Sequence, residues 1–149
     1  MKETNVTIAS TNFTNAILKN YKDYTIIDDN FTYEEILNSK KVIFLNILNN
    51  LKDSELKKLF EFINRNNILF VNVTNNLETS LYTDYLICYD KDKIIIEGST
   101  LDVLKNDKLL KRFGFKLPFM VELSLLLKDY DLVDKVYLNK EELRRILWK

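Results

Sequence analysis

Apolar and polar positions along this chain follow two rhythms, one of strand length and one of helical period. Short apolar runs are followed by stretches in which apolar residues recur every three or four positions, which is typical of a parallel sheet covered by helices. The runs are apolar throughout, as expected for strands covered on both faces. Strands are predicted at residues 6–9, 24–27, 42–45, 68–73 and 85–89, and residues 93–97 are predicted to return as an antiparallel edge strand.

Helix start signals complete this α/β pattern. Asp53 is the predicted N-cap of a helix at residues 54–64, which has one apolar and one charged face. Beyond Gly98 the pattern becomes wholly helical. Capping-box spacing occurs at Thr32 with Glu35 and at Asn139 with Glu142, and the later helices are predicted at residues 100–104, 107–113, 118–128 and 140–148.

These patterns divide the chain into an α/β core, residues 1–106, and a helical C-terminal extension, residues 107–149, which is expected to pack on the core. A dense apolar segment of the extension allows two interpretations. It is either a packed hinge between sheet and tail or a surface that pairs with another protein, since a large continuous apolar patch needs covering. The predicted interface residues are Phe113, Phe115, Pro118, Phe119 and Met120.

The composition fits one globular domain with a sizeable core, because 46% of the 149 residues are apolar. Twenty-two basic and twenty-two acidic residues give a net charge of zero, which argues against nucleic-acid binding by phosphate neutralisation. No apolar run reaches the length of a membrane span, and residues 1–5 lack a signal-peptide core. The expected location is the cytoplasm, with peripheral contact at the inner face of the membrane as a further expectation.

The chain has one cysteine and no histidine. Cys88 lies inside a predicted apolar strand, where a buried thiol is more common than a nucleophile or a ligand. Without histidine there is no zinc site of the usual ligand types and no histidine general base. No metal and no cofactor are therefore expected.

A segment beginning at Lys41 has the shape of an ATPase site without its chemistry. Its strand ends where two acidic residues would hold magnesium and orient water, and these places hold Asn46 and Ile47. The order of strand, motif and helix resembles the ATP-binding cassette (ABC) ATPases. The resemblance puts Asn46 on the metal-associated aspartate, Ile47 on the catalytic glutamate and Asp53 on the D-loop aspartate, while Asn75 replaces the histidine of the switch strand. As an N-cap, Asp53 also has a purely structural explanation.

The resemblance continues to the end of the chain. Residues 82–100 are similar to the family's "Tyr-Ala-Asp-Arg-Val-Ile-Val-Leu" hairpin, and residues 102–123 resemble the C-terminal half of energy-coupling-factor ATPases, which serve vitamin and cobalt uptake. The resemblance implies a mainly parallel, P-loop-NTPase-like sheet flanked by helices, with an antiparallel edge hairpin. Between residues 24 and 41 there is room for only one short strand and one short helix, so the helical signature subdomain is absent.

The segment after the first strand can be laid on the family's phosphate loop. Ala9, Asn12 and Thr14 then fall on glycines and Asn15 on the lysine, with Ala16 following in the same motif. A phosphate cradle needs glycines, so that backbone N–H groups can turn toward the phosphates, and a lysine to neutralise them. The alternative is an ordinary strand, polar turn and helix, which gives the same fold.

Two functions from different classes remain open. The first is a non-catalytic ABC-like partner, forming a homodimer, or a heterodimer with an intact ABC ATPase, and touching a transporter membrane subunit. The second is a small α/β ligand-binding or enzyme domain that uses the polar residues at the carboxyl ends of its strands. Asparagine and aspartate also gather at strand ends because they make turns and caps. A nucleotide sensor that binds without hydrolysis is a weaker third possibility.

Overall fold

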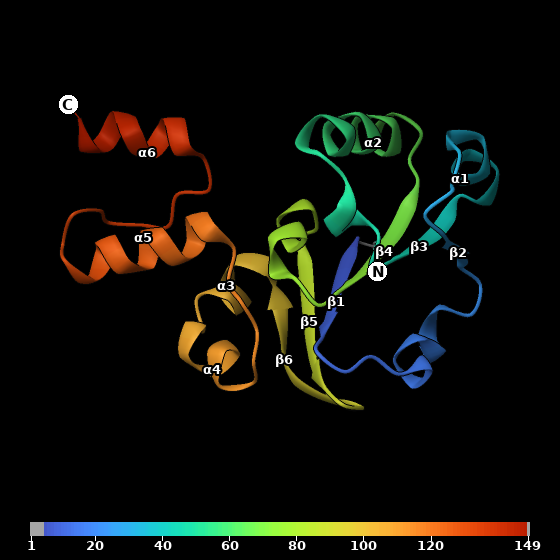
Figure 1. Ribbon diagram of the computed structural model, residues 1–149, viewed down its shortest axis with the longest axis horizontal. Coiled ribbons are helices and arrows are strands. Elements are labelled where there is room, and N and C mark those ends of the chain that lie inside the picture. Colours follow the sequence, from blue (N-terminus) through green and yellow to red (C-terminus); the bar gives the residue numbers. More distant parts are fainter. Residues whose placement is uncertain (1–4, 149) are drawn as a thin grey trace.

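A six-stranded sheet in the order β2-β3-β4-β1-β5-β6 forms the centre of the molecule (Figure 1). The computed structural model describes residues 5–148, so most of the segment used for the signal-peptide expectation and the last residue of the tail lie outside it. The strands are β1 (Val6–Ser10), β2 (Thr25–Ile27), β3 (Lys41–Leu45), β4 (Leu69–Thr74), β5 (Tyr85–Asp90) and β6 (Lys93–Ser99). The α-helices are α1 (Tyr33–Ser39), α2 (Asp53–Arg65), α3 (Thr100–Leu104), α4 (Asp107–Arg112), α5 (Phe119–Asp129) and α6 (Lys140–Leu147), and the 3-10 helices are η1 (Asn15–Tyr21), η2 (Leu48–Asn50) and η3 (Leu77–Tyr82).

The predicted fold class is confirmed. Strands β1 to β5 pair in parallel, and β6 returns antiparallel to β5 as the edge of the sheet. Helices flank the sheet, and this arrangement is compatible with a P-loop-like fold. None of the helices described between residues 5 and 148 is both long and apolar enough to cross a bilayer.

Alternation along the strands divides the core between the two faces of the sheet. Phe44 and Phe70 point to the face that carries α2, where they meet Phe60 and Ile63 of that helix. Ile43 of the same strand β3 points to the opposite face and packs with Ile17 of η1. Figure 1 shows α1 and α2 together on one side of the sheet and η1 on the other.

The tail continues the layer of α2 beyond the β5–β6 edge. Three residues of the tail pack against Ala9 and Cys88 on the same sheet face that carries α2. They are Leu110 of α4, Phe115 of the segment between α4 and α5, and Val121 of α5. Helix α6 then lies over α5 at the far end of the molecule (Figure 1), and a small separate cluster joins them. The members of that cluster are Met120, Val133, Tyr137 and Leu143.

The helix caps correct two details of the sequence prediction. Thr32 caps α1 by accepting the Glu35 N–H at 3.2 Å, as predicted. Asp53, in contrast, is the first residue of α2 and not its N-cap. The N-cap is Lys52, whose backbone N–H donates to the Glu55 carboxylate at 3.2 Å. Asn139 does cap α6, but through the N–H of residue 141 and not that of residue 142.

Candidate functional site

The carboxyl ends of β1, β3 and β4 lie at one edge of the sheet, because these strands are parallel and in register. Ala9 of β1 pairs with Thr74 of β4, and Leu45 of β3 pairs with Val73 of β4. Ligand sites of open α/β sheets lie outside such an edge. We call this edge the rim, and it consists of residues 11–16, 46–50 and 75–76.

The loop after β1 is fastened to the β5–β6 turn by its own side chains. Asn12 accepts a hydrogen bond from the Lys91 N–H through Oδ1 at 3.2 Å, and the Thr14 hydroxyl donates to Asp92 Oδ1 at 2.6 Å. Ala9 is fully buried in β1. The two exposed positions that the resemblance places on glycines therefore hold side chains that anchor the loop to the hairpin.

The backbone after β1 also differs from a phosphate cradle. Asn15 and Ala16 are exposed and open η1, a 3-10 helix of seven residues with no lysine at its start. Such a cradle uses glycines that turn N–H groups toward an anion, often with positive φ. Among residues 5–148, positive φ outside glycine occurs at Lys40, Asn46, Asn67, Lys91 and Asp131, none of them in this loop.

After β3, the two positions that the resemblance places on acidic residues differ in exposure. Asn46 is exposed, has a left-handed φ of 57° and donates its N–H to the Val73 carbonyl at 2.8 Å. Ile47 is buried in the cluster formed by α2, β3 and β4. The side chain at the place of a catalytic glutamate is therefore part of the hydrophobic core.

The amides of the rim bond mainly to one another and to nearby backbone. Asn49 Nδ2 donates to Asn75 Oδ1 at 3.4 Å, and the Thr74 hydroxyl donates to Asn49 Oδ1 at 2.8 Å. Asn76 accepts the Glu78 N–H at 3.0 Å and so caps η3. These contacts match the turn and cap interpretation of the rim, and no observation favours a ligand there.

Asn72, a buried polar residue that the sequence analysis missed, lies in β4 close to its carboxyl end. Asn72 is fully buried in β4, and its Nδ2 donates to the hydroxyls of Thr7 at 3.3 Å and Thr79 at 2.9 Å. Thr7 in turn shares a 2.6 Å hydrogen bond with Thr83. Asn72 Oδ1 has no hydrogen-bond partner among the described residues. The signal in the sequence was a single polar residue inside an otherwise apolar strand.

The remaining candidates for chemistry have structural roles. Asp28 Oδ1 accepts the Asn30 N–H at 3.0 Å, which closes a turn after β2. Burial raises the pKa of the Cys88 thiol to about 12, so it stays protonated and unreactive at neutral pH. Within residues 5–148, no group of three histidine, cysteine, aspartate or glutamate side chains is arranged to hold a metal ion.

The predicted interface residues are largely inside the molecule. Phe115, Pro118 and Met120 are buried, and Phe113 is half-buried against the same cluster as Phe115. Phe119 is 58% exposed, so it is the one member of the set that faces solvent. The packed-hinge interpretation accounts for the others, and their role in partner binding stays a prediction.

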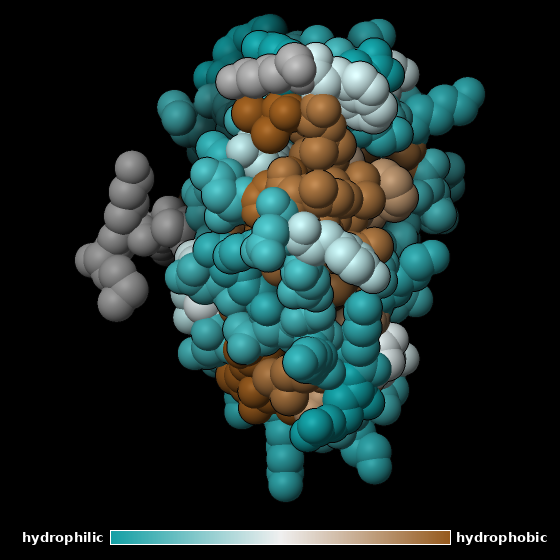
Figure 2. Space-filling view, turned by 90° about the vertical axis from the view of Figure 1, so that its left-hand side faces the viewer, coloured by the Kyte–Doolittle hydropathy of each residue, from teal (hydrophilic) through white to brown (hydrophobic). Residues whose placement is uncertain are grey.

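Exposed apolar side chains occur instead farther along the tail. Figure 2 shows apolar surface gathered over the face formed by the tail helices. A groove of about 600 Å³ in the tail, called the tail groove below, has a mixed lining of apolar and charged side chains: Lys128, Asp131, Leu132, Val133, Asp134, Tyr137 and Ile146. The exposed apolar residues of the tail are Phe119, Leu126, Tyr130, Leu132, Leu138, Ile146, Leu147 and Trp148.

Comparison with known proteins gives one informative likeness. No known family profile matches the chain. A protein of Pyrococcus horikoshii, provisionally named an ABC transporter ATP-binding protein, is 33% identical over 66 residues. The matched segment is 44% of this chain and 23% of that protein, so the chain spans less than a quarter of its relative. This likeness supports an ABC ATPase-like relationship for the matched part of the chain.

Proposed function

We propose that this chain is a non-catalytic ABC ATPase-like protein that acts as an assembly or regulatory partner of an energy-coupling-factor type transporter. The observation that carries the proposal is the burial of Ile47. Phosphoryl transfer needs a group that orients the attacking water and acidic side chains that hold magnesium. An isoleucine inside the core supplies neither function, and neighbouring Asn46 carries no charge.

The loop after β1 supports the same conclusion. Its polar side chains bind Lys91 and Asp92 of the hairpin, and the position of the phosphate-binding lysine holds Asn15. To receive a triphosphate, this loop would have to break both bonds and would still lack a cation. Magnesium-ATP binding is therefore expected to be weak or absent.

The partner function rests on the tail. Its exposed leucines and Trp148 leave apolar surface that a second protein can cover. The partner in this proposal is a second copy of the chain or an intact ABC ATPase, held at the cytoplasmic face of a transporter. The link to ABC transport is supported by the name of the Pyrococcus horikoshii relative, an ABC transporter ATP-binding protein.

Hydrolysis is tested by measuring phosphate release from magnesium-ATP by the purified chain, with an intact ABC ATPase as the positive control. We expect turnover no higher than the buffer blank, because several parts of the phosphoryl-transfer machinery are missing together. Turnover above the blank that Asn46→Ala abolishes would show that the rim is a working site and that the proposal is wrong.

Pairing is tested by light scattering on the native chain, Leu132→Asp and Ile26→Asp. Both side chains are more than half exposed, but Leu132 lies on the tail groove and Ile26 on the distant edge strand β2. We expect a dimer that only Leu132→Asp dissociates. A native chain that is monomeric at concentrations on the order of 100 μM would exclude a homodimer of micromolar affinity. A dimer unaffected by Leu132→Asp would place the interface elsewhere.

A further inference from the structure

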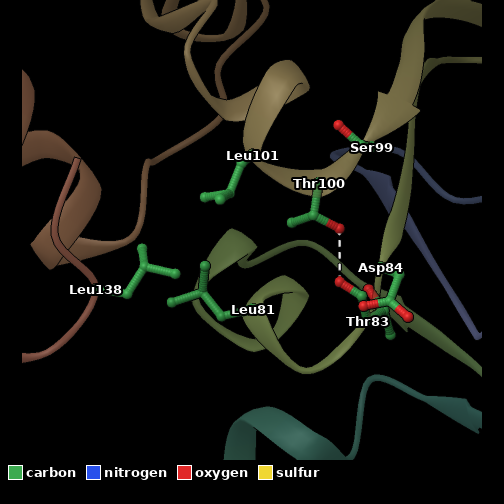
Figure 3. A pocket seen from close by; sticks show the side chains of 7 residues that line it. All are labelled: Leu81, Thr83, Asp84, Ser99, Thr100, Leu101 and Leu138. Carbon is green, nitrogen blue, oxygen red and sulfur yellow. Dashed lines mark hydrogen bonds between the residues drawn. The ribbon is translucent and has the colours of Figure 1, made fainter. Parts of the chain in front are cut away.

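A pocket of about 300 Å³ lies between the core and the tail, far from the rim (Figure 3). It is formed where η3 leads into β5, where β6 leads into α3, and where the loop before α6 passes over them. Its volume is at the lower end of the range for small-molecule sites. The lining residues are Leu81, Thr83, Asp84, Ser99, Thr100, Leu101 and Leu138.

The floor of the pocket is held together by hydrogen bonds. The Thr100 hydroxyl donates to the Thr83 carbonyl at 2.6 Å, and the Thr100 N–H donates to the Asp84 carbonyl at 3.0 Å. The hydroxyl and the backbone N–H of Thr100 therefore both donate to carbonyls of the floor and are not available to a ligand as donors. Figure 3 shows its hydroxyl directed to Thr83 and its methyl on the opposite side, toward the leucines. These two bonds hold the floor of the pocket in place.

Three leucines make the opposite wall. Leu81, Leu101 and Leu138 come from η3, α3 and the tail loop, and Figure 3 shows their side chains directed toward one another. Leu101 and Leu138 are each 40% exposed, so water in the pocket contacts their methyl groups. Displacing that water with an aliphatic group is favourable.

Asp84 gives the pocket its charge. The residue is exposed at the side of the floor, next to Thr83. In the part of the chain that the structure describes, no cation forms an ion pair with its side chain. A carboxylate beside an apolar wall and a hydrogen-bonded floor favours a cation with an apolar body over an anion or a sugar.

From this geometry we propose that the pocket binds a primary ammonium ion that carries a short aliphatic chain. The ammonium group pairs with Asp84, and the chain lies against Leu81, Leu101 and Leu138. The site joins the core to the tail, so the bound amine contacts both. This inference does not depend on the proposed function, because it uses none of the rim or the tail groove.

The test is a titration of the full chain, with labelled leucine methyl groups observed by NMR and hexylammonium as the probe. We expect saturable shifts of the methyl signals of Leu81, Leu101 and Leu138. Hexanoate has the same aliphatic chain with the opposite charge, and we expect it to bind more weakly. Asp84→Asn should weaken hexylammonium binding about two- to fivefold, the effect of one partly exposed ion pair.

Asp29→Asn is the matched control, because it removes an exposed carboxylate in the loop after β2, and it should leave the affinity unchanged. The proposal is overturned if hexylammonium produces no saturable shifts at the three leucines. It is equally overturned if hexanoate binds as well as hexylammonium, or if Asp84→Asn and Asp29→Asn behave alike.

Discussion

The sheet around α2 and the helical tail differ in how far their large apolar side chains are exposed to solvent. In the sheet region, Phe44, Phe60 and Phe70 are buried. The ring centroid of Phe70 lies 5.9 Å from that of Phe44 and 5.3 Å from that of Phe60. In the described part of the tail, four buried residues form the cluster between α5 and α6, and the partly buried Leu123 and Leu127 pack against it. Leu132, next to that cluster, remains 56% exposed.

This contrast separates a region that buries its large aromatic side chains from one that leaves several large apolar side chains exposed. In the sheet region, α2 covers Phe44 and Phe70 on the face of β3 and β4 that carries this helix. The tail covers one side of α5 with the core and leaves apolar side chains facing outward. Substitutions should therefore cost most in the sheet region, and the tail should depend on the contacts that dock it.

The largest effect is expected for Phe44→Ala. Removing a fully buried ring leaves a cavity between β3 and α2, and such changes cost about 3–5 kcal/mol. Phe119→Ala removes the same ring from an exposed site of the tail, where the Lys140 ammonium lies 5.7 Å from the ring centre, and should cost only about 0.5–1 kcal/mol. Urea unfolding of both variants measures the contrast, and equal costs would show that the two regions do not differ as described.

Asn72→Ala probes the polar group inside the sheet. The substitution leaves the buried Thr7 and Thr79 hydroxyls without this partner, at an expected cost of about 1–3 kcal/mol. Asn50→Ala changes an exposed asparagine of the rim and is the control. If both variants unfold at the same urea concentration as the native chain, the hydrogen bonds of Asn72 do not contribute to stability.

Cys88 makes stability depend on alkaline pH. Burial raises its folded-state pKa to about 12, whereas an unfolded thiol has a pKa of about 8.5. The buried, protonated thiol therefore makes its full contribution to the free energy of unfolding at any pH below the pKa of the unfolded state. As pH rises from there toward 12, the unfolded state ionises first, and stability falls by about 1.4 kcal/mol per pH unit. Cys88→Ala should remove this part of the slope, so parallel stability curves for both proteins between pH 8 and 11 would contradict it.

The positions of the strands and the antiparallel return of β6 were predictable because they depend on local apolar runs and one hairpin turn. The order β2-β3-β4-β1-β5-β6 was not predicted, because it depends on pairing between strands far apart in the sequence. The 3-10 helices η2 and η3 were not predicted. Ile47 at the N-cap of η2 makes no side-chain cap, and Asn76, which caps η3, also suits a plain turn. The N-cap of α2 was predicted one residue too late, at Asp53. There the sequence offered an acidic side chain, while the real N-cap, Lys52, uses its backbone N–H.

The site and the tail show the limits of sequence more clearly. The uncharged residues at the positions that the resemblance places on the family's site were visible in the sequence, but the burial of Ile47 depends on its packing with α2. The apolar segment of the tail was also visible. Which of its residues point into the molecule was not visible, because the burial of Phe115 depends on long-range contacts with the sheet. Periodicity identifies an apolar face, and only packing decides what that face meets.

The smallest expected effect tests how the tail is docked on the core. The Glu78 carboxylate of η3 accepts the backbone N–H of Phe119 at 3.0 Å, so a core residue caps the first turn of α5. Helix caps of this kind contribute typically about 1 kcal/mol, and a carboxylate also interacts favourably with a helix N-terminus. Glu78→Ala should therefore lower stability by about that amount and speed amide exchange in α5 more than in α2. Glu61→Ala, on the exposed face of α2, is the control. If exchange in α5 is unchanged, the tail is held by its buried residues alone, and the difference between the two regions is one of exposure and not of docking.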